Sequence, residues 1–508
     1  MIDIYMKKLF KDILIMIVVF SSGHDALSQD KVESIDLFKN HYKKITQIIV
    51  DDYGVDSTSM WLSSWDLGQE KYPFDFSHPD SIPCRVYLDR SVDAPGGSTL
   101  YWSLPDIAAV VELSEILRDP DFKLSARNYV GDYLRRCTAK NGVILWGNHY
   151  YYDVIDDRAV KFKSAEDPRF VDFEEELGDL HELRPLLPPW ELLYQWFPER
   201  VDDHIRKSSI KHIVDFETGE FNRHANQLSE YAFIEAGSII INSLAFLYSK
   251  TRDESLLKMA DLVVDYSFRN RNPTTGLVIN SPSRERWDQF TSTTEIGLWS
   301  LNILKALEYV PDQVKQSWTQ IVEKALEPWL LHGFDDTTGM YYGALNVKTG
   351  DPIEKTNDYP YQPQIYADIW NPLFPTHNYP MHFAESCLFL FEMTDNDRYK
   401  MGADRWVMSI RRQLEDRRYS GALYAENYAR IIHFLNRYGE MFNNNQARET
   451  AIQLADKAMD QLYVEESKMF RSHTREMRYD CVDGIGLLFF AINELQTGNC
   501  SEYSSSFF

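Results

Sequence analysis

The sequence predicts an all-α fold, an (α/α)6 toroid in which helical hairpins repeat around a ring and long polar-aromatic loops gather at one end. Six stretches of helix-like sequence each end in a short turn, most of them of the type Asn/Thr-Gly-apolar. Each interval between turns holds two predicted helices, and such a hairpin cannot bury its apolar face without neighbours. No strand-rich block interrupts the pattern. The six turns are Asn141-Gly142, Thr218-Gly219, Thr275-Gly276, Thr338-Gly339, Ser420-Gly421 and the Gly-less Lys468-Met469-Phe470.

Residues 1–28 have the pattern of a secretory signal peptide. Lys7, Lys8 and Lys11 precede an apolar run over 13–20, and small residues for cleavage follow over 26–28. The run is too short to span a bilayer, and no later segment approaches membrane-spanning length. We therefore expect an exported, periplasmic protein with no membrane partner.

Three further segments follow the signal. Residues 29–100 are predicted to form an N-terminal arm that opens with an amphipathic helix over 30–55, residues 101–496 the barrel as one catalytic domain, and residues 497–508 a short Ser-rich tail. From residue 101 apolar residues recur at helical spacing. After this first helix, further helices are predicted over 122–137, 189–213, 228–250, 254–270, 293–309, 312–332, 381–394, 397–416, 425–442, 446–463 and 482–496.

Composition excludes several classes of function. The net charge of −24 makes nucleic acid a poor partner. Five scattered cysteines match no zinc spacing, and most are expected to be buried as small hydrophobic residues. Because metal motifs, a Gly-rich phosphate loop and a GxSxG elbow are all missing from the sequence, we predict no metal and no cofactor. The sequence does not define an oligomeric state.

Polar and ring-bearing side chains follow the turns and should meet at one end of a closed ring. Arg223 and His224 come directly after the second turn, although a solvated loop would explain them equally simply. The other candidates of this kind are Trp146 and His149 after the first turn, Arg286 after the third, Tyr424 after the fifth, and His473 and Arg475 after the last.

Two long insertions, over 148–185 and 343–380, supply further candidates. Long loops in a compact fold are usually functional or disordered, and the density of Tyr, Trp, His and Pro here favours function. The first insertion ends in His181-Glu182-Leu183-Arg184, with Trp190 shortly after, which also suits a salt-bridged helix entrance. The second holds the densest cluster, which a packed loop would also explain: Asp368, Trp370, Asn371, His377 and Tyr379.

The segments HELRP, FNRHA and WNPLFPTHNYP, together with the helical hairpins, resemble the six-hairpin (α/α)6-barrel carbohydrate-active enzymes over about residues 100–496. Among them, the resemblance points to enzymes that act on uronic-acid-containing oligosaccharides. These are the ulvan oligosaccharide dehydratases, which are similar to polysaccharide lyases, and the related β-glucuronidase family. The implied partner is a uronic-acid-containing oligosaccharide.

Two reactions compete on such a barrel. Inverting hydrolysis needs two carboxylates about 6.5–9.5 Å apart, for which Asp66, Glu182, Asp368 and Glu426 are the candidates. β-Elimination at a uronate needs a neutralised carboxylate and groups that transfer protons.

The loops favour elimination, because His, Tyr, Arg and Asn outnumber isolated carboxylates in them. Arg223, Arg286 or Asn371 would hold the substrate carboxylate. His224 or His377 would act as base and Tyr379 as acid, with His181 and Glu182 as further catalytic candidates. A third hypothesis is a non-catalytic helical scaffold that binds glycans. The remaining substrate-binding candidates are Trp146, His149, Arg184, Trp190, Trp370, Tyr424, His473 and Arg475.

Overall fold

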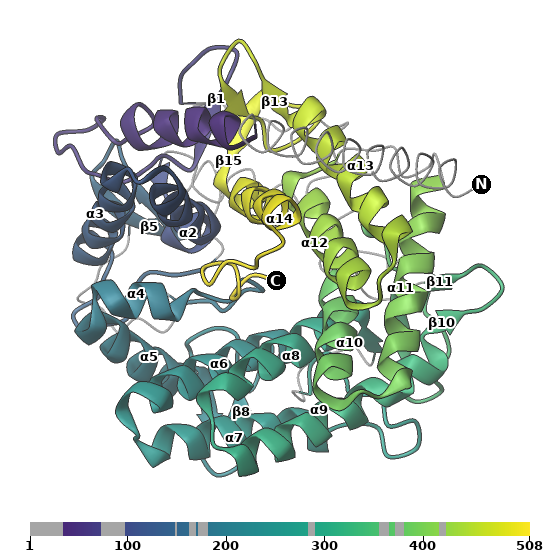
Figure 1. Ribbon diagram of the computed structural model, residues 1–508. Helices are drawn as coiled ribbons and strands as arrows, with labels where there is room; N and C mark the ends of the chain where they lie inside the picture. Colours follow the sequence, from purple (N-terminus) through teal and green to yellow (C-terminus); the bar gives the residue numbers. More distant parts are fainter. Residues whose placement is uncertain are drawn as a thin grey trace, which may run out of the picture.

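The helices form a closed ring of hairpins, seen along the ring axis in Figure 1. The computed structural model describes residues 34–72, 97–147, 150–161, 169–170, 181–282, 290–354, 365–370, 380–415 and 423–508. Within these residues an inner layer of helices surrounds the axis and an outer layer encloses it. The predicted all-α toroid of hairpins is therefore confirmed.

Six long helices form most of the inner layer in the described part of the chain. They are α2 (Leu100–Leu117), α6 (Ile234–Thr251), α8 (Thr293–Ala306), α10 (Met381–Thr394), α12 (Ala425–Met441) and α14 (Ile485–Thr497). The outer helices are α3 (Pro120–Arg136), α5 (Pro198–His212), α7 (Glu254–Arg269), α9 (Asp312–His332), α11 (Asp397–Glu415) and α13 (Asn445–Leu462). The short helix α4 (Trp190–Trp196) lies inside α5, and a helix over 34–47 packs outside α14.

The hydrophobic pattern explains which helices are inner and which are outer. Helix α8 buries all 14 of its residues, since it contacts neighbours on every side. Helix α11 instead buries a single stripe that includes Tyr399, Ala403, Trp406 and Ile410. An apolar stripe with a polar opposite face is the pattern of a helix at the surface.

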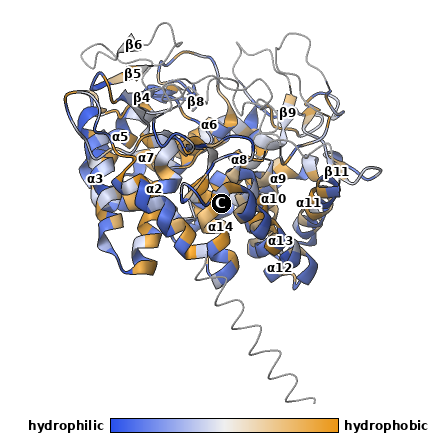
Figure 2. Ribbon diagram, turned by 90° about the horizontal axis from the view of Figure 1, so that it is seen from above, coloured by the Kyte–Doolittle hydropathy of each residue, from blue (hydrophilic) through white to orange (hydrophobic). Residues whose placement is uncertain are grey.

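The predicted turns connect outer helices to the inner helices that follow. Gly142, Gly219, Gly276 and Gly339 have φ between 74° and 87°, a left-handed conformation that glycine adopts without steric cost. The Gly-less turn places Lys468 at φ 54°. Ser420-Gly421 lies outside the described residues. Figure 2 shows the strands that accompany these turns at one end of the ring, which we call the turn end.

Short antiparallel hairpins close three of the turns. Each begins where an outer helix ends, and the hairpin then leads toward the axis. The pairs are β7 (Ile213–Asp215) with β8 (Glu220–Phe221), β10 (Phe334–Asp335) with β11 (Met340–Tyr341), and β13 (Tyr463–Val464) with β14 (Met469–Phe470). In addition, β9 (Phe290–Ser292) pairs with β12 (Ala344–Asn346).

The first insertion contains a small sheet rather than only irregular loop. Its strands are ordered β3 (Gly97–Ser98), β4 (Tyr150–Asp153), β5 (Arg158–Lys161) and β6 (Arg169–Phe170). The aromatic run of β4 suits a half-buried strand, and the turn that joins it to β5 contains Asp157 at φ 54°. The sheet covers the turn end above α2 and α3 (Figure 2).

The ring closes where the last inner helix meets the first. A Cβ added to Gly486 of α14 would lie 2.4 Å from the backbone carbon of Pro105 on α2, so only glycine permits this approach. The buried carboxylate of Asp106 accepts hydrogen bonds from the hydroxyls of Tyr42 at 2.9 Å and Tyr479 at 2.7 Å. Three segments distant in sequence are thus joined at this seam.

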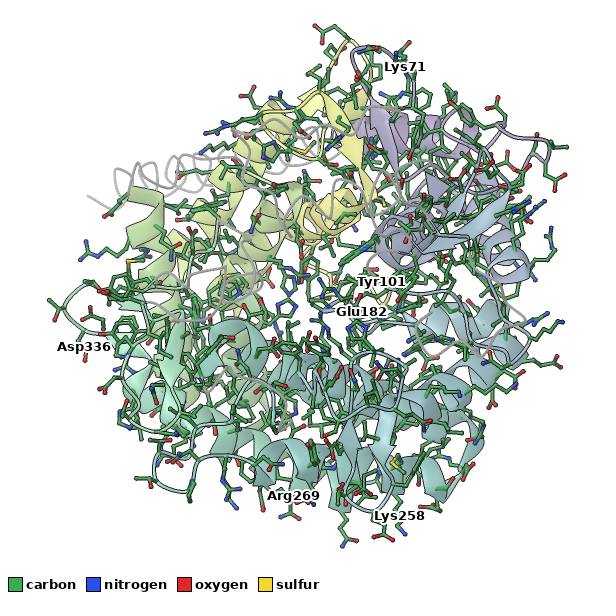
Figure 3. All side chains as sticks on the ribbon, turned by 180° about the vertical axis from the view of Figure 1, so that it is seen from behind. Lys71, Tyr101, Glu182, Lys258, Arg269 and Asp336 are labelled. Carbon is green, nitrogen blue, oxygen red and sulfur yellow. The ribbon has the colours of Figure 1, made fainter. Side chains whose placement is uncertain are left out.

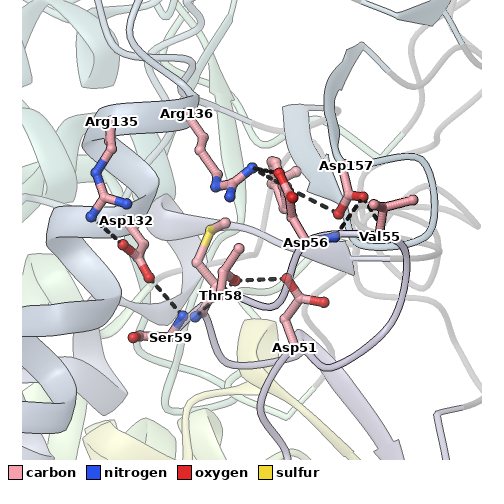
Figure 4. Close-up of polar contacts among 11 residues, drawn as sticks. Asp51, Val55, Asp56, Thr58, Ser59, Asp132, Arg135, Arg136 and Asp157 are labelled. Carbon is pink, nitrogen blue, oxygen red and sulfur yellow. Dashed lines mark hydrogen bonds and ion pairs between the residues drawn. The ribbon is translucent and has the colours of Figure 1, made fainter.

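The predicted N-terminal arm packs against the barrel. Phe38 makes an edge contact with Phe489 of α14, and β1 (Ser64–Asp66) pairs with β15 (Arg478–Asp480). Between helix and strand, the backbone N–H of Ser59 donates to Asp132 of α3 at 2.6 Å (Figure 4). The backbone N–H of Val55 donates to Asp157 at 2.8 Å.

The final residues turn back into the middle of the ring, where Figure 1 marks the C-terminus. The guanidinium of Arg430 on α12 donates to the carbonyl of Phe507 at 2.9 Å, and the ring of Phe508 stacks on His433 at 4.2 Å. Both phenylalanines are buried. In the described part of the chain, no helix is long and apolar enough to cross a membrane.

Candidate functional site

Three segments that the sequence separates widely meet beside the ring axis. Residue 146 pairs with His181 in a parallel β-bridge, and Glu182 pairs with His224 in an antiparallel one. The backbone N–H of Glu182 donates to the carbonyl of Trp146 at 2.9 Å, and that of Leu183 donates to the carbonyl of Arg223 at 2.9 Å. Figure 3 shows Glu182 near the centre of the ring. These bonds place the end of the first insertion against the loop after the second turn.

Glu182 lies between two guanidinium groups. Its Oε1 atom is 3.4 Å from Nη1 of Arg184, 3.4 Å from Nε of Arg223 and 4.0 Å from Nε2 of His224. The exposed fractions of the side chains are 4% for Glu182, 7% for Arg184, 16% for Arg223 and 25% for His224. The carboxylate is therefore buried, and the accessible groups of the cluster are His224 and Arg223.

The position of Arg223 also defines the protonation of His224. The Nε–H of Arg223 points to Nε2 of His224 at 3.4 Å, and an arginine can only donate. This contact favours the tautomer in which Nε2 is unprotonated, and the same Nε atom also lies 3.4 Å from Oε1 of Glu182. The guanidinium lies over the rings of Phe233 at 5.0 Å and Tyr231 at 5.6 Å, which restricts its position. The cluster presents an imidazole lone pair next to a fixed positive charge.

Two more carboxylates lie beneath the cluster at the starts of inner helices. Glu235 is in the first turn of α6, and its backbone N–H donates to Glu295 of α8 at 3.2 Å. Burial raises the pKa of Glu235, while the charges of Arg223 and Arg184 act in the opposite direction. Glu235 was not among the residues predicted from the sequence. The signal that identifies it is a recurrence, because α6, α8 and α12 each carry a Glu in the first turn.

His181 belongs to a buried chain of three imidazoles rather than to the exposed part of the cluster. The backbone N–H of Ile144 donates to Nδ1 of His204 at 3.1 Å. Nε2 of His204 is 3.3 Å from Nε2 of His181, whose Nδ1 is 2.7 Å from Nε2 of His212. Nδ1 of His212 then donates to the carbonyl of residue 222 at 2.7 Å.

The two ends of this chain define the tautomer of every ring. Because His204 accepts at Nδ1, its proton is on Nε2, and each following ring must accept at Nε2 and donate from Nδ1. All three rings are neutral. Burial lowers the pKa of His204 to about 3 and that of His212 to about 4, and it lowers the pKa of His181 well below its usual value. We therefore assign His181 to holding the loops of Glu182 and His224 together.

The two tryptophans of the first cluster are buried. Trp146 and Trp190 stack with ring centroids 6.0 Å apart, and their exposed fractions are 2% and 5%. The indole N–H of Trp190 donates to Ser243 of α6. Stacking on a sugar requires an accessible ring face, so we assign both residues to the core beneath the site rather than to substrate.

A second group of the predicted residues gathers at the start of α12. Tyr424 and His473 form a β-bridge, and their rings meet at 4.5 Å. Both are buried, as is Trp370, whereas Arg475 is exposed. The side chain of Asn427 donates to the carbonyl of residue 369 at 2.8 Å and so connects these segments.

A small cavity lies between the two groups. Pro185 and Leu186, just after Arg184, line one wall, while Glu426 and Arg430 of α12 line another. Glu426 accepts from Arg430 at 2.8 Å. His149, Arg286, Asn371, His377 and Tyr379 lie outside the described residues, so their roles stay predictions.

The carboxylates proposed for hydrolysis have local partners. Asp66 accepts from the backbone N–H groups of residues 68 and 69 in a turn, and Asp368 accepts from that of Trp370. Glu182 and Glu426 each contact arginine, which favours the ionised form over the protonated form that a general acid needs. Among the described residues, no group of three or more His, Cys, Asp or Glu side chains could hold a metal ion.

Comparison with known proteins relates this site to a family. Residues 107–232 match the model of a family described as periplasmic pectate lyase. The matched segment contains Glu182, Arg184, Arg223 and His224, and it ends before α6. The resemblance to (α/α)-barrel carbohydrate-active enzymes is thus confirmed at that level.

Solved structures with a similar fold act on several carbohydrates. An α-1,6-mannanase from Salegentibacter sp. HEL1_6 has a TM-score of 0.43 at 9% identity, with 91% of this chain and 99% of that chain covered. Cellobiose 2-epimerase from Bacillus thermoamylovorans B4167 has a TM-score of 0.45 at 7% identity, with the same coverage. A polysaccharide lyase has a TM-score of 0.41 at 10% identity, covering 91% of this chain and 52% of that one. No function is transferred at these values.

Proposed function

We propose that this protein is an exported lyase that acts by β-elimination at a uronate of a polysaccharide or oligosaccharide. The observation that carries the proposal is the contact between Nε2 of His224 and the guanidinium of Arg223, in the most accessible part of a cluster that otherwise is buried. The match of residues 107–232 to a pectate lyase family supports the same reaction class. Export agrees with the predicted signal peptide and with the periplasmic description of that family.

Charge is arranged for binding a carboxylate. Arg184 and Arg223 share Glu182 as their close counter-charge, and the carboxylate of Glu235 lies beneath both. Arg223 is the more exposed of the two guanidinium groups. A uronate carboxylate at Arg223 would have its charge neutralised, which makes the hydrogen on C5 more acidic and stabilises the enolate formed when it leaves. Glu182 keeps both guanidinium groups in position.

The reaction then follows from the neutral imidazole. Nε2 of His224 removes the proton from C5, and the electron pair of that C–H bond forms the C4–C5 double bond. The C4–O bond breaks, and the leaving oxygen receives a proton from an acid, the role that the sequence assigns to Tyr379. A positioned general base contributes about 10²–10⁴ to such a rate. Ulvan and pectate are the two substrate classes to compare.

Elimination and hydrolysis give different products, which makes the test direct. The mature protein is incubated with polygalacturonate and with ulvan-derived, glucuronate-containing oligosaccharides, and the ultraviolet absorbance of a 4,5-unsaturated uronate is followed. Each assay is run after chelation and again with added Ca²⁺ or Mn²⁺, so that elimination with and without a divalent ion is compared. A rise in absorbance with either substrate supports the proposal.

Two variants connect the activity to the cluster. His224→Ala should lose turnover and keep its thermal unfolding temperature, while the exposed His332→Ala, on α9, should keep both. If saturated products with new reducing ends are released and no absorbance appears, the reaction is hydrolysis and not elimination. Binding without turnover under all conditions would favour a glycan-binding scaffold.

A further inference from the structure

A cavity of about 320 Å³ lies within the barrel, away from the cluster around Glu182. Inner helices start at the turn end, so their last turns lie at the other end of the ring. The cavity is lined there by Lys305 in the last turn of α8, by Tyr309 just beyond it and by Phe389 near the end of α10. Asn242 of α6, Ser506 of the C-terminal segment and the charged residues Glu308 and Lys315 also line it. Its size is within the range of about 300–1,000 Å³ typical of small-molecule sites.

Lys305 gives this cavity a chemical character. The residue is only 9% exposed, and its Nζ donates to the carbonyl of Ser506 at 3.1 Å. No carboxylate oxygen of the described residues lies within 4.0 Å of that nitrogen, although many other lysines of the chain form such pairs. An ammonium group has three donors, and buried lysines are rarely left without a counter-charge. The cavity therefore has cationic donor capacity that the fold does not use.

The charged neighbours act on Lys305 from several helices. Burial lowers the pKa of Lys305 to about 7, and the positive charges of Arg430 and Arg437 act in the same direction. The carboxylates of Glu385 and of Glu308, which lines the cavity, oppose this effect. An anion bound directly at Nζ would add a counter-charge in contact with the ammonium group.

We propose that this cavity binds a carboxylate ligand of about monosaccharide size, whose carboxylate accepts hydrogen bonds from Lys305. Asn242 and Tyr309 line the same space and offer polar groups to a sugar. A uronate, the class of product that the proposed elimination releases, has the matching charge and size. The choice of uronates rests on the proposed function, whereas binding of a plain carboxylate does not.

Proton uptake distinguishes this site from the cluster around Arg223. At pH 8 the amine of Lys305 is mostly neutral, and a bound carboxylate would favour the ammonium form. Binding should then take up close to one proton from the buffer. An arginine is protonated at every accessible pH, so proton uptake at the cluster would have to come from His224, and Arg223→Met removes carboxylate binding there.

Calorimetric titration at pH 8 in two buffers of different ionisation enthalpy measures both affinity and proton uptake. The probes are galacturonate, glucuronate and acetate, with neutral galactose and inorganic phosphate for comparison. We expect uronate binding with about one proton taken up, and no binding of galactose. The variants are Lys305→Met and Lys305→Gln in the cavity, the exposed Lys324→Met on α9 as a matched control, and Arg223→Met in the candidate active site.

The proton-linked binding should weaken at least tenfold in both Lys305 variants and stay unchanged in Lys324→Met and Arg223→Met. The proposal would be overturned if binding were unchanged in the Lys305 variants or if galactose bound as tightly as a uronate. It would also be overturned if phosphate bound more tightly than any carboxylate, or if no carboxylate bound. If Arg223→Met loses turnover but still binds carboxylates at the cavity, the two sites are separate. If the elimination assay fails, binding of acetate still tests whether the cavity takes a carboxylate.

Discussion

Glu182 and His224 face each other across an antiparallel β-bridge, with Oε1 of the carboxylate 4.0 Å from Nε2 of the imidazole. The backbone pairing brings Arg223 to the same carboxylate, at 3.4 Å from its Nε. A single short ladder thus assembles the proposed base His224, the cation Arg223 and the carboxylate Glu182 that contacts the cation. Its parts come from two different hairpin connections of the ring.

Arg223→Lys tests the shape of the cation. Lysine keeps the positive charge but lacks the planar fork that donates to two carboxylate oxygens together, and its ammonium would not hold the same position over Phe233. We expect kcat/KM for a uronate substrate to fall by about tenfold or more, with thermal stability little changed. Activity equal to that of the wild type would exclude carboxylate binding by Arg223.

Glu182→Gln tests the counter-charge. The substitution leaves two guanidinium groups close together with the same shape around them but no charge between them, and the side chain is only 4% exposed. Breaking a buried ion pair by removing one partner costs about 3–5 kcal/mol. The free energy of unfolding measured with urea should fall by about this amount. Glu191→Gln, whose pair with Lys250 is exposed, should change stability by less than about 1 kcal/mol.

The imidazole chain predicts a loss of stability in mild acid. The pKa values of His204 and His212 in the fold, about 3 and about 4, lie below the value of 6.5 expected in the unfolded chain. Between these limits the unfolded chain binds more protons, so stability falls as the pH drops below 6.5. At pH 5 each ring lowers the free energy of unfolding by roughly 2 kcal/mol.

His204→Gln checks this relation, because an amide oxygen can still accept from the backbone N–H of Ile144 while the titrating group is gone. The free energy of unfolding is measured between pH 7 and pH 5 for both proteins. The variant should lose roughly 2 kcal/mol less than the wild type over this interval. Parallel pH profiles would show that His204 is not held neutral.

Lys305→Met should stabilise the unliganded protein. The pKa of Lys305 is about 7 in the fold against 10.5 when unfolded, so between these values the unfolded chain binds more protons and stability rises with pH. The lysine therefore destabilises the fold most below pH 7. Methionine should raise the free energy of unfolding at pH 6, by roughly 5 kcal/mol at most. The gain should shrink toward pH 10, and a constant gain would contradict the buried amine.

The seam of the ring depends on the shared carboxylate of Asp106. Asp106→Ala leaves the buried hydroxyls of Tyr42 and Tyr479 without this acceptor, at a cost of about 1–3 kcal/mol for each. Tyr42→Phe removes one hydrogen bond and should cost about 1 kcal/mol. Thermal unfolding of the two variants compares these values. Equal stability of Asp106→Ala and the wild type would show that the seam is held by apolar packing alone.

Much of the architecture was determined by the sequence alone, because it depends on local patterns. The turns at Gly142, Gly219, Gly276 and Gly339 follow from a residue that tolerates positive φ, and the inner and outer helices differ in how far their apolar residues extend around the helix. The placement of Arg223 and His224 near the axis followed from the turn that precedes them. Local sequence specifies such features before any distant contact forms.

The tertiary structure alone decided what each side chain contacts. Periodicity shows that a residue is buried but not against which partner, so His181 could not be recognised as the middle of a chain that includes His204 and His212. Trp146 is buried because two tryptophans from different segments stack on each other. In the sequence, Lys305 is indistinguishable from an ordinary lysine in the last turn of a helix. Its environment depends on the position of residue 506, whose carbonyl it contacts in the folded ring. These relationships arise from contacts between segments far apart in the chain, and only the closed ring brings those segments together.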